Sequence, residues 1–175
     1  MSHEEHKRAA PRTVRVYVVT ASDSRSERED TSGAWLQSAA AAAGHPLVGY
    51  RVVKDEPEAI RAALDDAARA GAQAIVVNGG TGIAVRDRTY EAVEGRLEKR
   101  LDGFGELFRM LSYADIGSAA MLSRATAGVW DGRVVFCVPG STAAVRLAWE
   151  KLIAPELPHL VRELSKHLAP GGPGG

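Results

Sequence analysis

Short apolar runs alternate with helix-type patterns through the first half of the chain. The runs at residues 14–20, 47–53 and 74–77 are rich in β-branched side chains, which favours strands. Between them, apolar residues recur at helical spacing, from Thr31 or Ser32 to Gly44 and from Pro57 to Gly71. Such alternation predicts parallel strands with helices on both faces of the sheet.

The second half of the chain departs from this alternation. Apolar residues at 93, 97 and 101 predict a helix that begins at Thr89. The remaining expected elements are helical segments at 101–113 and 116–123, a short antiparallel strand at 127–129, and a last strand at 134–138. A final helical region follows, in which Pro155 and Pro158 are expected to bend or break the helix.

Composition narrows the class of protein. The 22 basic and 22 acidic residues balance, so the chain lacks the basic excess of a general nucleic-acid binder. Residues 1–12 lack the apolar core of a signal peptide, and no apolar run approaches the ~20 residues of a membrane helix. We therefore expect a cytoplasmic protein with one domain at 13–168, between disordered tails at 1–12 and 169–175.

The single cysteine, Cys137, lies in the last apolar run and is expected to be a small buried side chain.

A glycine-rich stretch, Asn78-Gly79-Gly80-Thr81-Gly82, follows the third predicted strand. Glycines allow tight turns and close approach of a ligand to backbone N–H groups, and the carboxylate of Asp87 follows shortly after. This order favours a phosphate cradle with a carboxylate beside it. The spacing matches neither a P-loop nor a dinucleotide fingerprint. Taken alone, the stretch fits a simple connecting turn equally well.

Polar segments follow each of the three predicted parallel strands, at residues 22–32, 54–56 and 78–87. Because the carboxyl ends of parallel strands share one edge of a sheet, these three segments predict a single pocket. The last predicted strand also ends in a polar segment, at 139–142. Within the predicted pocket, Asp55 or Glu56 is expected to cap the helix that begins near Pro57, and the residue pattern alone favours a simple N-cap as the role of Asp55.

Several motifs occur in an order that resembles one family. They are Ser22-Asp-Ser-Arg25, Asp30-Thr-Ser-Gly33, the glycine stretch with Arg86-Asp-Arg-Thr89, Gly103-Phe-Gly-Glu-Leu-Phe-Arg109, Ser123-Arg-Ala125 and Pro139-Gly-Ser141. This order is similar to that of the MoaB/MogA molybdenum cofactor biosynthesis proteins, over about residues 14–164. The short first loop is closer to the MoaB branch.

The resemblance implies a fold, an activity and partners. The fold is a three-layer α/β/α domain with a mostly parallel sheet, assembled as a homotrimer or as a hexamer of stacked trimers. Family members transfer AMP from ATP to the phosphate of molybdopterin, with Mg²⁺ bound, and release pyrophosphate. The product passes to the protein that inserts molybdate. Some MoaB proteins are not known to need this activity.

The resemblance also implies roles for individual residues. Asp55 and Asp87 match the acidic catalytic positions and are the expected Mg²⁺ ligands. Residues matching the nucleotide-phosphate site are Gly79, Gly80, Thr81, Gly82, Ser22 and Asp23. Residues matching segments for molybdopterin are Glu106, Ser123, Arg124, Pro139, Gly140 and Ser141. For Asp55, this role replaces the helix cap that the local pattern favours.

Two positions depart from the family pattern. Asn78 stands where threonine is usual, and Thr142 stands where proline is common.

The leading hypothesis for the function is a Mg²⁺-dependent molybdopterin adenylyltransferase, and two alternatives remain open. The first alternative is a non-catalytic carrier or scaffold that binds molybdopterin or a nucleotide. The second alternative is a relative that uses another nucleotide or pterin, because nothing in the sequence distinguishes adenine from guanine.

Overall fold

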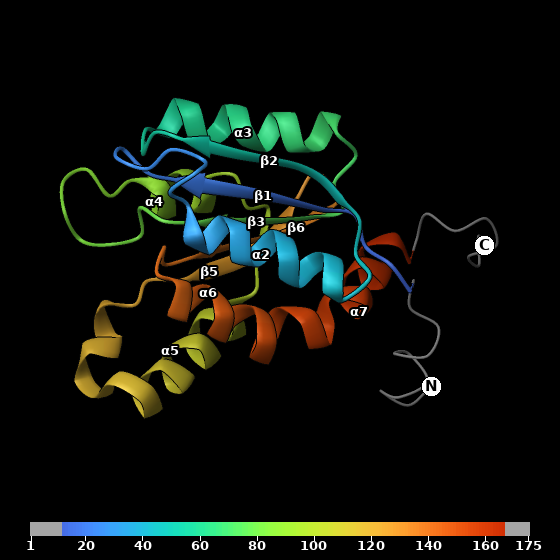
Figure 1. Cartoon of the computed structure of the whole chain (residues 1–175). Coiled ribbons are helices and arrows are strands. Elements are labelled where there is room, and N and C mark those ends of the chain that lie inside the picture. The colour runs from blue at the N-terminus through green and yellow to red at the C-terminus, as the bar shows by residue number, and fades with distance from the viewer. Residues whose placement is uncertain (1–11, 167–175) are drawn as a thin grey trace.

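The computed structural model describes residues 12–166 and centres on one six-stranded sheet (Figure 1). Its strands are β1 (Val16–Ala21), β2 (Leu47–Val53), β3 (Ala74–Asn78), β4 (Lys99–Arg100), β5 (Thr126–Trp130) and β6 (Arg133–Val138). They lie in the order β2-β1-β3-β6-β5-β4. All paired neighbours are parallel except those of β5, which is antiparallel to both β6 and β4. The expected mostly parallel sheet with one antiparallel strand is confirmed.

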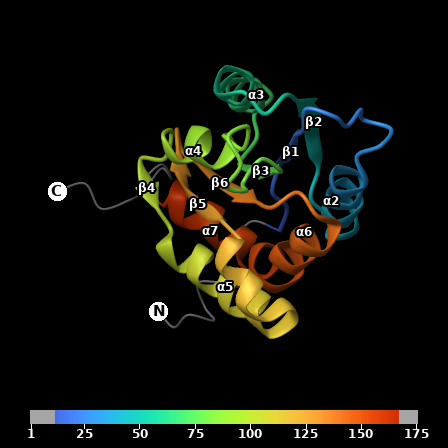
Figure 2. The same cartoon turned by 90° about the vertical axis from the view of Figure 1, so that its left-hand side faces the viewer.

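Helices cover both faces of the sheet and complete three layers (Figures 1 and 2). The helices α3 (Pro57–Arg69) and α4 (Thr89–Glu94) pack on one face. The opposite face carries α2 (Thr31–Ala42), α5 (Asp102–Ile116), α6 (Thr142–Ala148) and α7 (Ala154–Ser165). A 3-10 segment, η1 (Gly117–Leu122), extends α5, and a π-type segment, η2 (Trp149–Ile153), joins α6 to α7. None of these helices is long and apolar enough to cross a membrane.

The central strands supply both halves of the core. Val16 and Val18 of β1 pack with α2, α6 and α7, whereas Tyr17 and Val19 pack against α3. Alternate residues of a strand point to opposite faces, so a strand covered on both sides is apolar throughout. Cys137 of β6 is fully buried in the α3 layer, as its surroundings in the sequence predict.

The helix expected to run from Thr89 through Leu101 is shorter than predicted. It ends at Glu94, and Gly95 forms its C-cap. Val93 belongs to the cluster beneath α3, whereas Leu101 packs against the cluster on the other face of the sheet. One helix face cannot serve both layers, so the chain crosses between them through the short strand β4.

The C-terminal helices also differ from expectation. Pro155 and Pro158 both lie within α7, so neither ends the helix. Pro155 is in the first turn of α7, directly after the π-type segment η2. The irregular segment is η2, which precedes both prolines. The tails predicted at 1–12 and 169–175 lie, apart from Arg12, outside the described residues.

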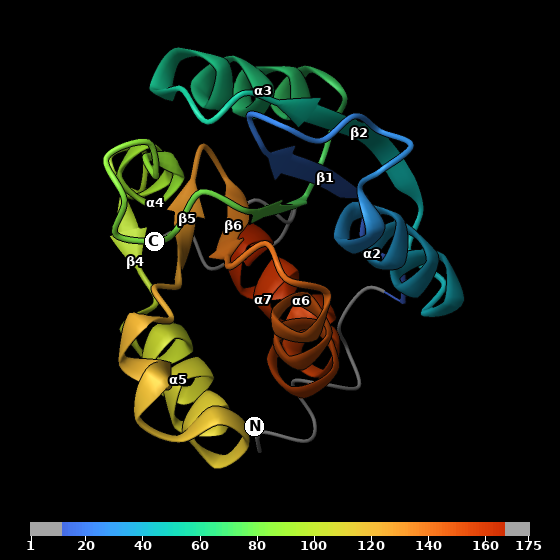
Figure 3. The ribbon, with the colours of Figure 1, turned by 60° about the vertical axis from the view of Figure 1, so that its left-hand side comes forward.

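The strand order changes direction between β1 and β3. From β1 the chain continues to β2 on one side, and β3 extends the sheet on the other. Loops that follow such strands open a crevice at the carboxyl edge, where α/β sheets bind ligands. Figure 3 shows the loops after β1, β3 and β6 meeting at this edge, with α5 projecting beside them.

Candidate active site

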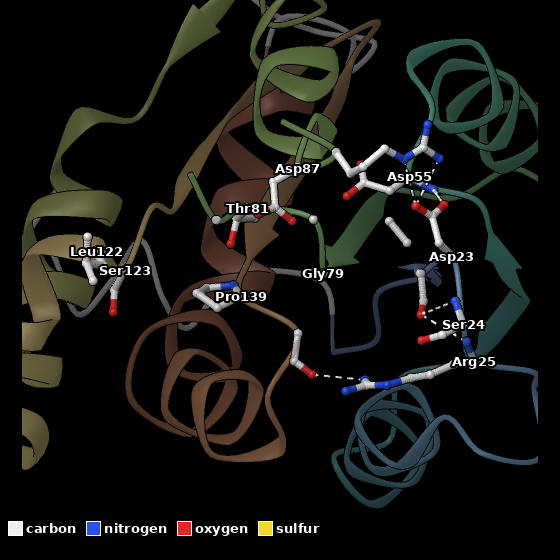
Figure 4. Close-up of a pocket in the computed structure, with 16 residues that line it drawn as sticks. Asp23, Ser24, Arg25, Asp55, Gly79, Thr81, Asp87, Leu122, Ser123 and Pro139 are labelled. Atoms are coloured by element: carbon white, nitrogen blue, oxygen red, sulfur yellow. Dashed lines mark hydrogen bonds and ion pairs between the residues drawn. The ribbon is translucent and has the colours of Figure 1, made fainter. Parts of the chain in front are cut away.

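A cleft of about 490 Å³ opens at this edge of the sheet (Figure 4). It is lined by Ala21, Ser22, Asp23, Ser24, Arg25, Asp55, Gly79, Gly80, Thr81, Gly82, Arg86, Asp87, Leu122, Ser123, Pro139 and Gly140. The lining therefore draws on the segments after β1, β2 and β3, as the strand-end argument predicts, and also on the segment after β6. Of the expected catalytic and phosphate-binding residues, all eight line this one cleft.

The glycine loop has a conformation that requires its first two glycines. Gly79 and Gly80 have φ angles of +93° and +63°, which L side chains rarely adopt. A Cβ atom on Gly79 would stand 2.2 Å from the carbonyl oxygen of Ala21. On Gly80 it would stand 2.1 Å from the hydroxyl oxygen of Thr89. The loop thus lies directly on the neighbouring strand and helix.

Three successive N–H groups of this loop have no acceptor within the described part of the chain. The N–H of Gly79 donates to the carbonyl oxygen of Val138 at 3.1 Å, but those of Gly80, Thr81 and Gly82 meet no protein acceptor among residues 12–166. Buried or half-buried N–H groups normally have a partner. Successive free N–H groups in a concave turn are a recognised anion-binding arrangement.

Asp55 binds the chain that follows the glycine loop, at the start of α4. Its Oδ1 accepts the N–H of Arg88 at 3.0 Å and the hydroxyl of Thr89 at 2.9 Å, at the start of α4. The residue is only 5% exposed. Burial raises the pKa of Asp55 above the ordinary carboxyl value; the charges of Asp87 and Asp23 also raise it, while the two hydrogen bonds oppose the shift.

Two further aspartates lie closer to solvent. Asp23 accepts Nε and Nη2 of Arg86 at 3.1 and 2.9 Å and also the N–H of Asp55 at 3.1 Å. The Arg86 guanidinium, followed by the Asp55 N–H, holds the pKa of Asp23 below its usual value. Asp87 accepts the N–H of Ala84 with Oδ2 at 3.0 Å. Its carboxylate faces the glycine loop from the other side, as Figure 4 shows.

An apolar pocket of about 170 Å³ adjoins the polar cleft. Its lining is Phe108, Ser112, Asp115, Ile116, Ser123, Pro139, Ser141, Ala143, Ala144 and Leu147. Ser123 and Pro139 line both spaces, so they mark the junction between them. The combined site can accept a ligand that is charged at one end and carries a less polar group at the other.

Two expected molybdopterin residues lie outside both spaces. Glu106 lines a separate polar pocket with Tyr90, Glu94 and Arg109. Arg124 stacks on the ring of Tyr90 at 4.3 Å, pairs with Glu91 and donates to the carbonyl oxygen of Gly82 at 3.1 Å. Arg124 thus supports the glycine loop from behind rather than lining the cleft.

Asn78 belongs to a buried polar network beneath the loop. Its amide nitrogen donates to the hydroxyl of Thr20 at 2.9 Å and to the carbonyl oxygen of Val19 at 3.2 Å. Its Oδ1 lies 3.0 Å from the hydroxyl of Ser32, which also lies 3.1 Å from Asp30. The departure from threonine therefore keeps the start of the loop tied to β1 and α2.

Arg25, Arg86 and Leu122 also line the cleft, although the sequence predicts no individual role for them. Arg25 and Arg86 lie in polar segments at strand ends, so that position was the available signal. Leu122 gave no such signal, because only the path of η1 brings it to the cleft.

Comparison with known proteins agrees with the fold and the motifs. Residues 17–159 match a family model described as "Probable molybdopterin binding domain". A relative named molybdenum cofactor biosynthesis protein B, from Halalkalibacterium halodurans, is 52% identical over 95% of this chain and 99% of its own length.

Solved structures of proteins with similar sequences have the same fold. A crystal structure of molybdenum cofactor biosynthesis protein B matches with a TM-score of 0.86 and 50% identity, covering 90% of this chain and 99% of that one. A tungsten cofactor synthesizing protein from Pyrococcus furiosus matches with a TM-score of 0.83 and 38% identity, covering 89% and 99% of the two chains. The fold, the motif order and the relatives therefore all support the same family assignment.

Proposed function

The chain belongs to the MoaB/MogA family of molybdenum cofactor biosynthesis proteins, and from this premise we propose that it transfers AMP from ATP to the phosphate of molybdopterin. Its role in molybdenum cofactor biosynthesis follows from the family; the adenylyl transfer is our proposal. One observation carries it: three acceptor-free N–H groups lie in a cleft that also holds two carboxylates and adjoins an apolar pocket.

The proposed reaction needs positioning more than acid–base catalysis. An oxygen of the molybdopterin phosphate forms a bond to the α-phosphorus of ATP. The bond from that phosphorus to the bridging oxygen breaks, and pyrophosphate leaves with the electron pair. The attacking group is already an anion, so no strong base is required. The N–H groups of Gly80, Thr81 and Gly82 would hold phosphate oxygens in place and stabilise their charge.

The carboxylates suit Mg²⁺ that arrives with the nucleotide. No cluster of three or more potential metal-ligating side chains occurs within the described part of the chain. Magnesium commonly binds one or two carboxylates together with substrate phosphates. Asp87, and Asp55 through the oxygen that accepts no hydrogen bond, would contribute those ligands. The ion would neutralise phosphate charge.

The test is release of pyrophosphate from ATP by the purified protein with molybdopterin and Mg²⁺. We expect Asp87→Asn to lower turnover by about 100-fold or more, the usual loss when one well-placed electrostatic group is removed. Asp102→Asn, at an exposed position outside the cleft, should match the wild type. Normal turnover in Asp87→Asn would remove Asp87 from the mechanism. Molybdopterin binding by the wild type without pyrophosphate release would favour the carrier function.

We also propose that the chain forms a homo-oligomer. α5 and η1 expose Leu107, Met110, Tyr113, Ile116, Met121 and Leu122 on one side of the molecule. Apolar patches of this kind mark interaction surfaces. Trp149, in the segment that follows α6, is in contrast only 3% exposed and belongs to the core. Delivery of the product to a molybdate-inserting protein remains part of the proposed pathway role.

A further inference from the structure

We propose that Arg25 binds the phosphate of the acceptor substrate and so makes the site selective for a phosphorylated pterin. This assignment rests on the proposed function, and it concerns a residue to which the sequence motifs gave no role. Two arginines line the cleft, Arg25 and Arg86, together with three aspartates. What distinguishes the arginines is how each guanidinium is already bound.

Arg86 is neutralised within the protein. Its Nε and Nη2 bind the carboxylate of Asp23, and Nη2 also lies 3.7 Å from Glu56. Arg25 has no carboxylate within 4.0 Å among residues 12–166. Of the two arginines that line the cleft, Arg25 is therefore the one that an anionic ligand can bind without breaking an existing ion pair.

The Arg25 guanidinium is held by one nitrogen only. Nη1 donates to the carbonyl oxygen of Gly140 at 3.2 Å and approaches the hydroxyl of Ser32 at 3.4 Å. The backbone N–H of Arg25 donates to Ser22 Oγ at 3.1 Å, which fixes the start of the side chain. Nε and Nη2 have no acceptor in the described part of the chain. These two nitrogens form the edge that binds two oxygens of one phosphate.

The position of Arg25 identifies which phosphate it can bind. Its side chain spans from the loop after β1 to the loop after β6, as Figure 4 shows. Gly140 lies between Pro139 and Ser141, both of which line the apolar pocket. A phosphate on the free edge of Arg25 lies near the junction of that pocket with the polar cleft. An acceptor with its pterin in the apolar pocket must present its phosphate at this junction to reach a nucleotide on the glycine loop.

Calorimetric binding tests the assignment without requiring turnover. Wild type, Arg25→Gln, Arg25→Lys and Arg28→Gln are titrated separately with molybdopterin, with dephosphorylated molybdopterin and with Mg-ATP. Arg28 is a matched control, because it is exposed in the same loop and does not line the cleft. Thermal unfolding of each variant checks that the fold is retained.

We expect Arg25→Gln to weaken molybdopterin binding by about 10- to 100-fold, the range for a lost charged hydrogen-bonded contact. Binding of the dephosphorylated compound and of Mg-ATP should change less than about twofold, because neither places a phosphate on Arg25. Arg25→Lys should recover part of the loss, since lysine keeps the charge but not the two-pronged geometry. Arg28→Gln should bind as the wild type does.

Other outcomes overturn the assignment. Wild-type affinity in Arg25→Gln, or an equal loss for the dephosphorylated compound, would show that Arg25 does not bind the acceptor phosphate. A loss confined to Mg-ATP would place Arg25 on the nucleotide. If wild type binds molybdopterin through Arg25 but releases no pyrophosphate, the adenylyl transfer fails and the Arg25 assignment stands. If wild type does not bind molybdopterin, both fail.

Discussion

Asp55 joins separate segments of the chain through one carboxyl group. It follows β2, yet its oxygen accepts the N–H of Arg88 and the hydroxyl of Thr89, which begin α4. Its backbone N–H in turn donates to Asp23 after β1. One residue thus holds together three segments that form the polar half of the cleft. This arrangement has a cost in folding free energy, because the charge of Asp55 is placed where water has little access.

That cost makes stability depend on pH. The pKa of Asp55 is raised in the folded state, so its ionisation weakens the fold as the pH rises from the unfolded value, about 4, through the folded value. Asparagine carries no charge at any pH. We therefore expect Asp55→Asn to gain stability relative to wild type between pH 4 and pH 7.5.

Urea unfolding at several pH values measures this effect. The quantity of interest is the difference in free energy of unfolding between variant and wild type. Glu27→Gln, at an exposed position in the loop after β1, is the control and should show a smaller dependence. A difference for Asp55→Asn that stays flat across the range would contradict the burial of an ionised Asp55.

The sequence predicted several residues that lie at the site, but not which residues they bind there. The sequence indicated Asp55 or Glu56 as the cap of α3; Glu56 is that cap, and the Asp55 carboxylate instead accepts hydrogen bonds from Arg88 and Thr89 at the start of α4. That partner depends on the order β2-β1-β3, which no local pattern contains. Arg25 and Arg86 are likewise alike in sequence, and only the position of Asp23 separates the paired arginine from the available one.

At the scale of elements, strand positions followed closely from β-branched runs. The strand at 47–53 is β2 as predicted, and β3 extends the predicted run by one residue, Asn78. Helix ends were harder to predict. The cap of α2 is Asp30, whose side chain accepts the N–H of Gly33, rather than Thr31 or Ser32. All three residue types favour caps, so local preference cannot choose among them.

Asp30 does more than cap α2. It is 1% exposed and accepts the hydroxyl of Tyr50 at 2.6 Å, in addition to its contacts with Ser32 and Gly33. Burial alone would raise the pKa of Asp30, but hydrogen bonds from Thr20, Tyr50, Gly33 and Ser32 together hold it below its ordinary value. Its stabilising effect is therefore lost as the pH falls through that lowered value.

We expect Asp30→Ala to reduce the free energy of unfolding by about 3 kcal/mol at pH 7, because it removes a cap worth about 1 kcal/mol and leaves buried donors unpaired at about 1–3 kcal/mol. Urea unfolding followed by circular dichroism measures the loss. Ser141→Ala is a matched control, since the Ser141 side chain caps α6 through the N–H of Ala144. Its expected loss is about 1 kcal/mol. Equal losses in the two variants would show that Asp30 contributes a cap alone.

At the scale of the whole molecule, α5 and η1 expose several large apolar side chains. Met110 and Tyr113 of α5 are 61% and 65% exposed, and Leu107 and Ile116 of α5 and Met121 and Leu122 of η1 are exposed as well. The sequence at 104–111 is rich in apolar residues, but its pattern does not separate the buried positions, Phe104 and Phe108, from the exposed ones, Leu107 and Met110. That division appears only when α5 is placed against the sheet.

If the chain forms the proposed homo-oligomer through α5 and η1, we expect Met110→Glu to convert it to monomers, because a charge in an apolar contact would be buried without a partner. Sedimentation velocity of wild type and variant measures the change in mass. Ala62→Glu, on the outer face of α3, introduces the same charge elsewhere and should leave the oligomer intact. An oligomeric Met110→Glu would place the interface on another surface.

The pairing of β3 with β6 has a consequence for the order in which the molecule is made. Ala74 pairs with Val134, about sixty residues later in the chain, and Gly79 donates to Val138 in the same ladder. During synthesis, β1, β2 and β3 emerge long before β6, and such distant pairings form slowly. Until β6 is in place, Gly79 lacks its acceptor on Val138 and the cleft lacks the wall that carries Gly140. The cleft is therefore complete only after β6 has joined the sheet.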